Sequence, residues 1–103
     1  MKVEESSAGI TIKGLVSRRN LAIPRPFTFV FLDDLIYVLH SDKNESVVYV
    51  YDTKGITIDM RRYDFPMEKV TEEDGKPVVF YTKGNSRFKS TLSNASFLQT
   101  EYV

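Results

Sequence analysis

Residues 15–32 (LVSRRNLAIPRPFTFVFL) constrain the fold most, because the spacing of their apolar residues changes midway from helical to extended. The side chains that would share one stripe of an α-helix are Leu15, Val16, Arg19, Ala22 and Ile23. Pro24 and Pro26 end this pattern, since proline lacks an N–H donor and disfavours helical geometry at the residue before it. The stretch therefore predicts a helix that hands over directly to a strand at Phe27.

The predicted helix covers residues 3–23, with a weaker first half. Glu4 and Glu5 suit a helix N-terminus, and Arg18, Arg19 and Arg25 suit the C-terminal end of the dipole. Two glycines and a β-branched run (ITI) oppose a helix before residue 15, so residues 9–13 are open to a second interpretation as a short strand.

Extended segments separated by short polar turns follow the two prolines. Strands are predicted at residues 27–32, 35–40, 47–51, 56–60, 78–82, 87–92 and 96–103. Residues 61–77 contain two prolines and an acidic run, which indicates a surface loop or a pair of short irregular strands. The predicted fold class is α+β, a single domain over residues 1–103 in which the helix packs on an antiparallel meander of six to seven strands.

The net charge is zero but unevenly distributed. Residues 1–32 carry five basic and two acidic side chains, residues 33–75 five and eleven, and residues 76–103 four and one. Such banding suits contacts between complementary neighbours, and solvated loops produce it equally well. There is no cysteine and no apolar run of 18 residues, so the sequence predicts neither a disulfide nor a membrane-spanning helix.

Candidate catalytic groups are few. His40 is the single histidine, and no Gly-x-Ser-x-Gly motif accompanies it, so we expect a structural role at a strand end. The pairs Asp33/Asp34 and Asp42/Glu45 suit turns better than a cation site, because calcium-loop spacing is missing. The sequence predicts no enzymatic activity, no cofactor and no metal.

A basic edge is predicted around the turn after residue 82. Lys83, Arg87, Phe88 and Lys89 would present cations and one aromatic ring to phosphates or to an acidic protein surface. A solvated hairpin tip is the alternative interpretation.

Two segments resemble a known family. The run RNLAI at residues 19–23 with the following PFTFV, and DFPMEKV at residues 64–70 with the later VFYTKG, are similar in order to motifs of minor type IV pilins and type II secretion pseudopilins of the FimT/GspH-like group. In that family the first motif marks the helix-to-strand junction, which here would contain Arg19, Ala22, Pro24 and Pro26.

The resemblance implies a non-enzymatic filament subunit of a bacterial envelope, anchored in the inner membrane by an N-terminal transmembrane helix that this chain lacks, with a methylated N-terminus. Its partners would be other pilin or pseudopilin subunits, and Arg61 and Arg62 are the predicted assembly contacts. The alternative is a binding module of the same machinery that engages DNA or a secreted protein through Lys83, Arg87 and Lys89.

Overall fold

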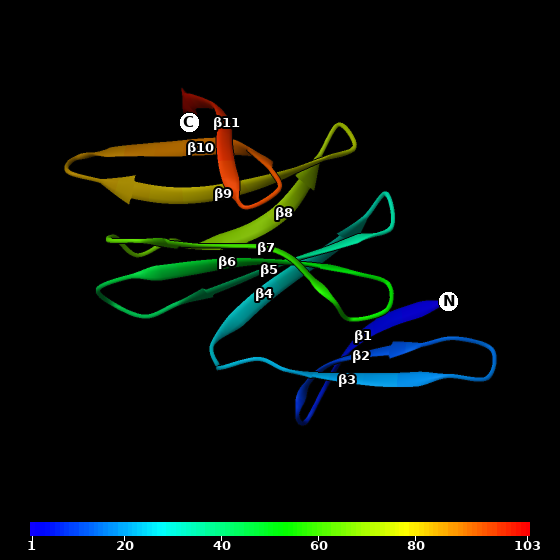
Figure 1. Cartoon of the computed structure of the whole chain (residues 1–103). Helices are drawn as coiled ribbons and strands as arrows, with labels where there is room; N and C mark the ends of the chain where they lie inside the picture. Colours follow the sequence, from blue (N-terminus) through cyan, green and yellow to red (C-terminus); the bar gives the residue numbers. More distant parts are fainter.

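Three antiparallel sheets, formed one after another along the chain, make up the computed structural model, which describes residues 1–103 (Figure 1). The N-terminal sheet contains β1 (Lys2–Ser6), β2 (Gly9–Lys13) and β3 (Arg18–Ala22). The central sheet contains β4 (Phe27–Leu32), β5 (Leu35–Ser41), β6 (Ser46–Asp52) and β7 (Thr57–Tyr63). The C-terminal sheet contains β8 (Lys69–Glu73), β9 (Lys76–Lys83), β10 (Ser86–Ser93) and β11 (Ser96–Tyr102). Within each sheet, every strand pairs with the next one in sequence.

Tight turns explain this simple order. Asp33–Asp34 joins β4 to β5 and Asp74–Gly75 joins β8 to β9, and both residues of each turn have positive φ. Two-residue turns of this kind match the right-handed twist of the flanking strands, so they direct the chain straight back along its neighbour. Each sheet is consequently a meander built from local hairpins.

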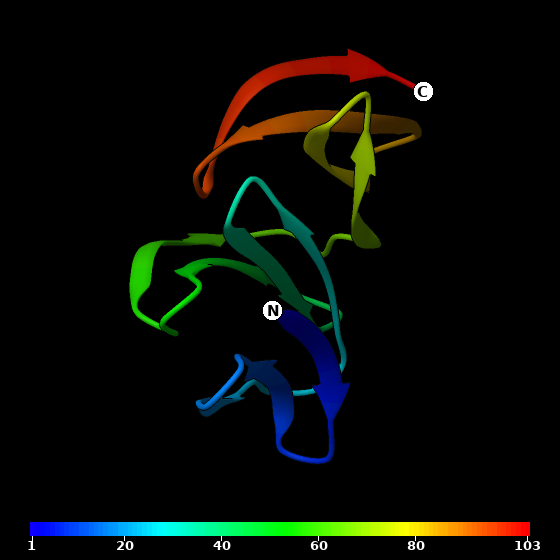
Figure 2. The same cartoon turned by 90° about the vertical axis from the view of Figure 1, so that its right-hand side faces the viewer.

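The three sheets stack face to face, so the middle strands of the central sheet, β5 and β6, are buried on both sides (Figures 1 and 2). Alternation along β5 shows this clearly: Ile36 and Val38 pack toward the N-terminal sheet, whereas Tyr37 and Leu39 pack toward the C-terminal sheet. Ile10, Ile12 and Leu21 cover the first face. The residues of the C-terminal sheet that cover the second face include Val70, Val79, Tyr81 and Leu92.

Polar contacts join the central and C-terminal sheets. The first strands of the two sheets, β4 and β8, meet where the Val70 N–H donates to Thr28 Oγ1 at 2.9 Å. A second contact joins β7 to the turn between β10 and β11. The Tyr63 hydroxyl donates to the Ala95 carbonyl at 2.6 Å, and the Ala95 N–H donates to Asp59 Oδ2 at 3.0 Å. Four-stranded meanders that follow one another along the chain are also the unit that β-propellers repeat around an axis.

The predicted N-terminal helix is wrong, and with it the α+β fold class. Residues 3–23 form β1, β2 and β3, so the second interpretation of residues 9–13 as a strand is confirmed. The apolar side chains that face the central sheet, Ile10, Ile12, Leu21 and Ile23, recur with period two. Leu15 and Val16, which would have shared a helix stripe, lie in the turn between β2 and β3.

The resemblance to pilins and pseudopilins is wrong for the same reason. The segment 19–23 lies on and after β3 instead of ending a helix, and Pro24 and Pro26 connect two strands instead of a helix and a strand. An all-β chain gives no support to a type IV pilus or type II secretion assignment. The structure contains no helix of the length and apolarity needed to cross a membrane.

The predicted single meander of six to seven strands is also wrong, because the eight strands after the prolines form two separate four-stranded sheets, each of which is a meander. β4 has the predicted bounds 27–32, and β5, β6, β9 and β10 are one to three residues longer than predicted. β7 begins one residue later and ends three residues later than predicted, and β11 ends one residue earlier. Residues 61–77, expected to be a loop or short irregular strands, contain the end of β7, all of β8 and the start of β9.

Candidate functional site

The basic edge predicted from the sequence is engaged in ion pairs within the C-terminal sheet. Arg87 donates from Nε and Nη2 to the two carboxylate oxygens of Glu68, at 3.2 and 2.8 Å. This pairing lowers the pKa of Glu68 and raises that of Arg87. Lys89 Nζ lies 2.9 Å from Glu73 and 3.6 Å from Glu101, and the bond to Glu73 raises the pKa of Lys89.

The other members of that edge lie elsewhere. Phe88 packs on the inner face of its sheet, with its ring centroid 5.6 Å from that of Tyr81. Arg87 and Lys89 point to the opposite face, as alternation along a strand requires. Lys83 Nζ lies 4.8 Å above the ring of Phe65. The four residues therefore do not form one surface, and Lys83, Arg87 and Lys89 as a binding edge remain a prediction.

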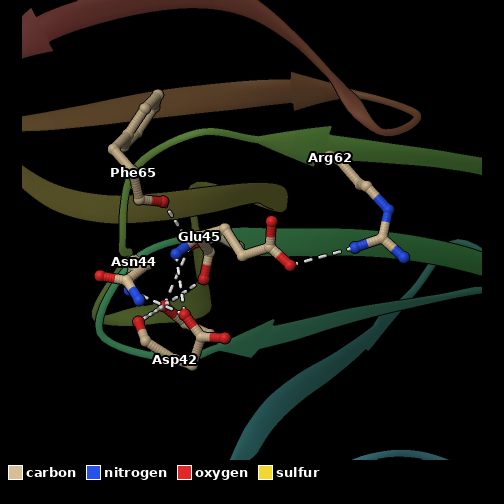
Figure 3. A network of polar contacts seen from close by, with 7 residues as sticks. Asp42, Asn44, Glu45, Arg62 and Phe65 are labelled. Atoms are coloured by element: carbon tan, nitrogen blue, oxygen red, sulfur yellow. Dashed lines mark hydrogen bonds and ion pairs between the residues drawn. The ribbon is translucent and has the colours of Figure 1, made fainter.

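Arg61 and Arg62, predicted as assembly contacts, lie on the exposed edge strand β7. Arg62 pairs with Glu45 at 3.2 Å (Figure 3). Arg61 forms no ion pair. Figure 3 also shows how the loop before β6 is fixed: Asp42 Oδ1 accepts the N–H groups of Asn44 and Glu45 at 2.7 and 2.8 Å. These two bonds lower the pKa of Asp42 and fix the loop geometry.

The remaining candidates from the sequence occupy structural positions. His40 Nδ1 lies 2.9 Å from the Pro26 carbonyl and so ties β5 to the segment that leads into β4. Asp33 and Asp34 form a turn. No group of three or more His, Cys, Asp or Glu side chains is arranged to hold a metal ion. Arg19 and Ala22, the first two residues of the predicted helix-to-strand junction, lie on β3.

The largest cavity, about 380 Å³, lies between β3 and the turn that joins β6 to β7. Three of the residues that line it are cationic and two carry hydroxyls: Arg18, Arg19, Lys54, Ser17 and Thr53. No carboxylate lines this cavity, whereas the two smaller ones, about 230 and 180 Å³, are each lined by acidic side chains. A volume of this size is within the range of small-ligand sites.

The local structure positions the stem of Arg19 and the backbone of Lys54. Arg19 lies on the face of β3 that points toward the central sheet, and its aliphatic stem lies against Gly55. The turn that carries Lys54 is fixed because Asp52 Oδ1 accepts the N–H groups of Lys54 and Ile56, both at 2.9 Å. Arg18, Arg19 and Lys54 take part in none of the ion pairs of the structure.

A row of like charges adjoins the cavity. Arg18 is directly opposite Lys13 in the register of β3 with β2, and Lys13 is directly opposite Lys2 in the register of β2 with β1. Glu4 pairs with both lysines, and its pKa is lowered by them. Glu4 therefore offsets the two lysines, whereas Arg18, which is directly opposite Lys13, takes part in no ion pair.

Sequence reasoning missed this site because the arginines were assigned to a helix end. A helix dipole gave a sufficient local explanation for Arg18 and Arg19, and nothing in the sequence brought the turn at Lys54 beside them. The signal that was present is the cationic enrichment of residues 1–32. Comparison with protein-family models, curated proteins and solved structures finds no match for this chain.

Proposed function

We propose that this protein is a non-enzymatic binding module that holds a phosphate-bearing anion between β3 and the turn joining β6 to β7. One observation carries the proposal: the largest cavity is lined by Arg18, Arg19 and Lys54, and none of the three has an ion-pair partner. No carboxylate is among the residues that line the cavity. The binding-module class was the alternative expectation from the sequence, and the proposed site differs from the predicted edge.

The chemistry of the lining side chains suits phosphate. Guanidinium groups donate in a planar fork that matches phosphate oxygens, and an ammonium supplies a point charge. Ser17 and Thr53 add hydroxyl donors at the same cavity. A hydrogen bond to a charged group contributes about 1.5–3 kcal/mol, so two or three such contacts give about 3–9 kcal/mol before the cost of association, and we expect binding in the millimolar range.

Isothermal titration calorimetry with inorganic pyrophosphate tests this site. The triple variant Arg18→Gln, Arg19→Gln, Lys54→Gln should bind at least about 100-fold more weakly, because the charged donors are removed. The matched control, Lys83→Gln, Arg87→Gln, Lys89→Gln, removes the same charge from the edge predicted from the sequence. It should bind pyrophosphate with nearly wild-type affinity.

The two triple variants separate the two sites. Loss of binding in the second variant with retention in the first would overturn the cavity and support the edge of Lys83, Arg87 and Lys89. Absence of pyrophosphate binding by the wild-type chain at low salt would overturn both. Because the contacts are ionic, affinity at a true site should fall steeply as salt is raised.

A second candidate function, assembly with other copies or with a partner protein, is favoured by β7. This strand is an edge of the central sheet, and Ile58 and Met60 on it are 47% and 49% exposed. Unpaired edges accept a further strand, and lysine on an edge blocks such pairing. We expect Ile58→Lys, Met60→Lys to lower the mass measured by sedimentation equilibrium to that of a monomer. A wild-type chain that is monomeric at every concentration would exclude self-assembly through β7.

A further inference from the structure

The turn between β2 and β3 presents two aliphatic side chains to water. Leu15 and Val16 are 103% and 101% exposed, the most exposed large apolar residues of the chain. The Gly14 N–H donates to the Ser17 carbonyl at 2.8 Å and closes the turn behind them. Apolar side chains held out in this way, with no neighbour in the chain to cover them, are suited to a partner that is itself apolar.

Cations surround this tip on both sides of the hairpin. Lys13 ends β2 and Arg18 begins β3, so the two flank the turn directly. Arg19 and Lys54 line the adjoining cavity. An aliphatic tip with a collar of Lys and Arg is the composition of segments that lie at the surface of an anionic bilayer, with apolar groups in the acyl boundary and cations at the headgroups.

We infer that the phosphate-bearing anion of the proposed function is the headgroup layer of an anionic bilayer, with Leu15 and Val16 inserted below it. This inference rests on the proposed function, because the headgroup phosphates take the place of the anion in the cavity. A soluble phosphate compound would satisfy Arg18, Arg19 and Lys54 but would leave both aliphatic side chains in water. The surface of an anionic phospholipid bilayer offers phosphate and hydrocarbon side by side.

The expected contributions are large enough to measure. Each cation close to an anionic leaflet should raise the partition coefficient about fivefold, so the cavity triple variant should bind vesicles about 100-fold more weakly. Transfer of each aliphatic side chain out of water should raise the partition coefficient about tenfold or more. Replacement of both tip residues should therefore weaken vesicle binding about 100-fold without changing any charge.

Tryptophan fluorescence of Leu15→Trp tests insertion directly, since the chain contains no tryptophan. Vesicles made of equal parts of phosphatidylcholine and phosphatidylserine should shift its emission to the blue, and brominated lipid should quench it. Pyrophosphate alone should leave the emission unchanged, because it brings no hydrocarbon to the tip. An emission that stays at the solvent position on vesicles that bind the protein would overturn insertion.

Sedimentation with the same vesicles completes the test. The variant Leu15→Ser, Val16→Ser should lose vesicle binding and keep its affinity for pyrophosphate. The matched control Leu98→Ser, Val103→Ser removes an exposed leucine and an exposed valine elsewhere, and should bind vesicles like wild type. Pyrophosphate binding without vesicle binding would overturn the bilayer and leave the anion site standing. Absence of both would overturn the proposed function itself.

Discussion

Gly9→Ala should destabilise the N-terminal sheet by about 3 kcal/mol or more, the sum of a strained φ and a backbone clash. Gly9 is buried at the start of β2 with a φ of 142°, and a Cβ there would lie 2.4 Å from the Leu21 carbonyl oxygen and 2.7 Å from the Ile23 nitrogen. Both atoms belong to the backbone, so relief requires β2 and β3 to move apart. Thermal unfolding followed by circular dichroism should show a midpoint lowered by about 12 °C or more.

Gly84→Ala is a milder comparison, because the φ of Gly84 lies in the left-handed region that alanine can adopt at modest cost. Gly84 also has a positive φ, 64°, but a Cβ at this position would meet no atom within 4 Å. We expect a cost of about 1 kcal/mol. Equal destabilisation by the two substitutions would show that the close approach of β2 to the backbone of β3 has no energetic consequence.

The individual strands after the prolines were predictable because their signals are local. Phe27, Phe29 and Phe31 alternate with their neighbours along β4, and the Asp33–Asp34 turn follows at once. Short turns of this kind fix which strands pair, so no long-range information was needed. The division into separate stacked sheets was not predictable, because the residues that link them, such as Tyr63 and Ala95, are far apart in sequence.

The helix was predicted wrongly because a short apolar pattern fits two periods. Leu15, Val16, Ala22 and Ile23 match a helix stripe, yet residues 19, 21 and 23 also match one face of a strand. Packing decided between the two, since Leu21 and Ile23 meet the flat apolar face of the central sheet. The β-branched residues of β2 already favoured the extended alternative.

The candidate site was less predictable from the sequence than the strands were, because it depends on tertiary structure. Arg87 and Lys89 were singled out because they lie close together in sequence, but Glu68 and Glu73 reach them from β8 and its preceding linker. Arg19 and Lys54 were never considered together, because 35 positions separate them and only the stacking of sheets brings both to one cavity. The sequence gives the number of charged side chains, but only the folded structure shows which of them form ion pairs.

Ile10→Ala should open the N-terminal sheet while the other two sheets stay folded. Ile10 is fully buried on β2 and packs only in the cluster between the N-terminal and central sheets. Truncation of a buried isoleucine costs about 2–5 kcal/mol. Since this cluster shares no residue with the one between the central and C-terminal sheets, the loss falls on one interface, as in a chain of stacked repeats.

Leu92→Ala is the matched substitution at the opposite end, because Leu92 is buried on β10 in the other cluster. Hydrogen exchange should show reduced protection of β1–β3 in Ile10→Ala and of β8–β11 in Leu92→Ala, with the central sheet protected in both. Uniform loss of protection over all three sheets in either variant would contradict independent opening of the sheets and indicate a single cooperative unit.

Independent opening has a consequence for binding, because Arg18 and Arg19 lie on the N-terminal sheet whereas Lys54 lies in the turn that follows β6 of the central one. Ile10→Ala should then weaken anion binding, and Leu92→Ala should not.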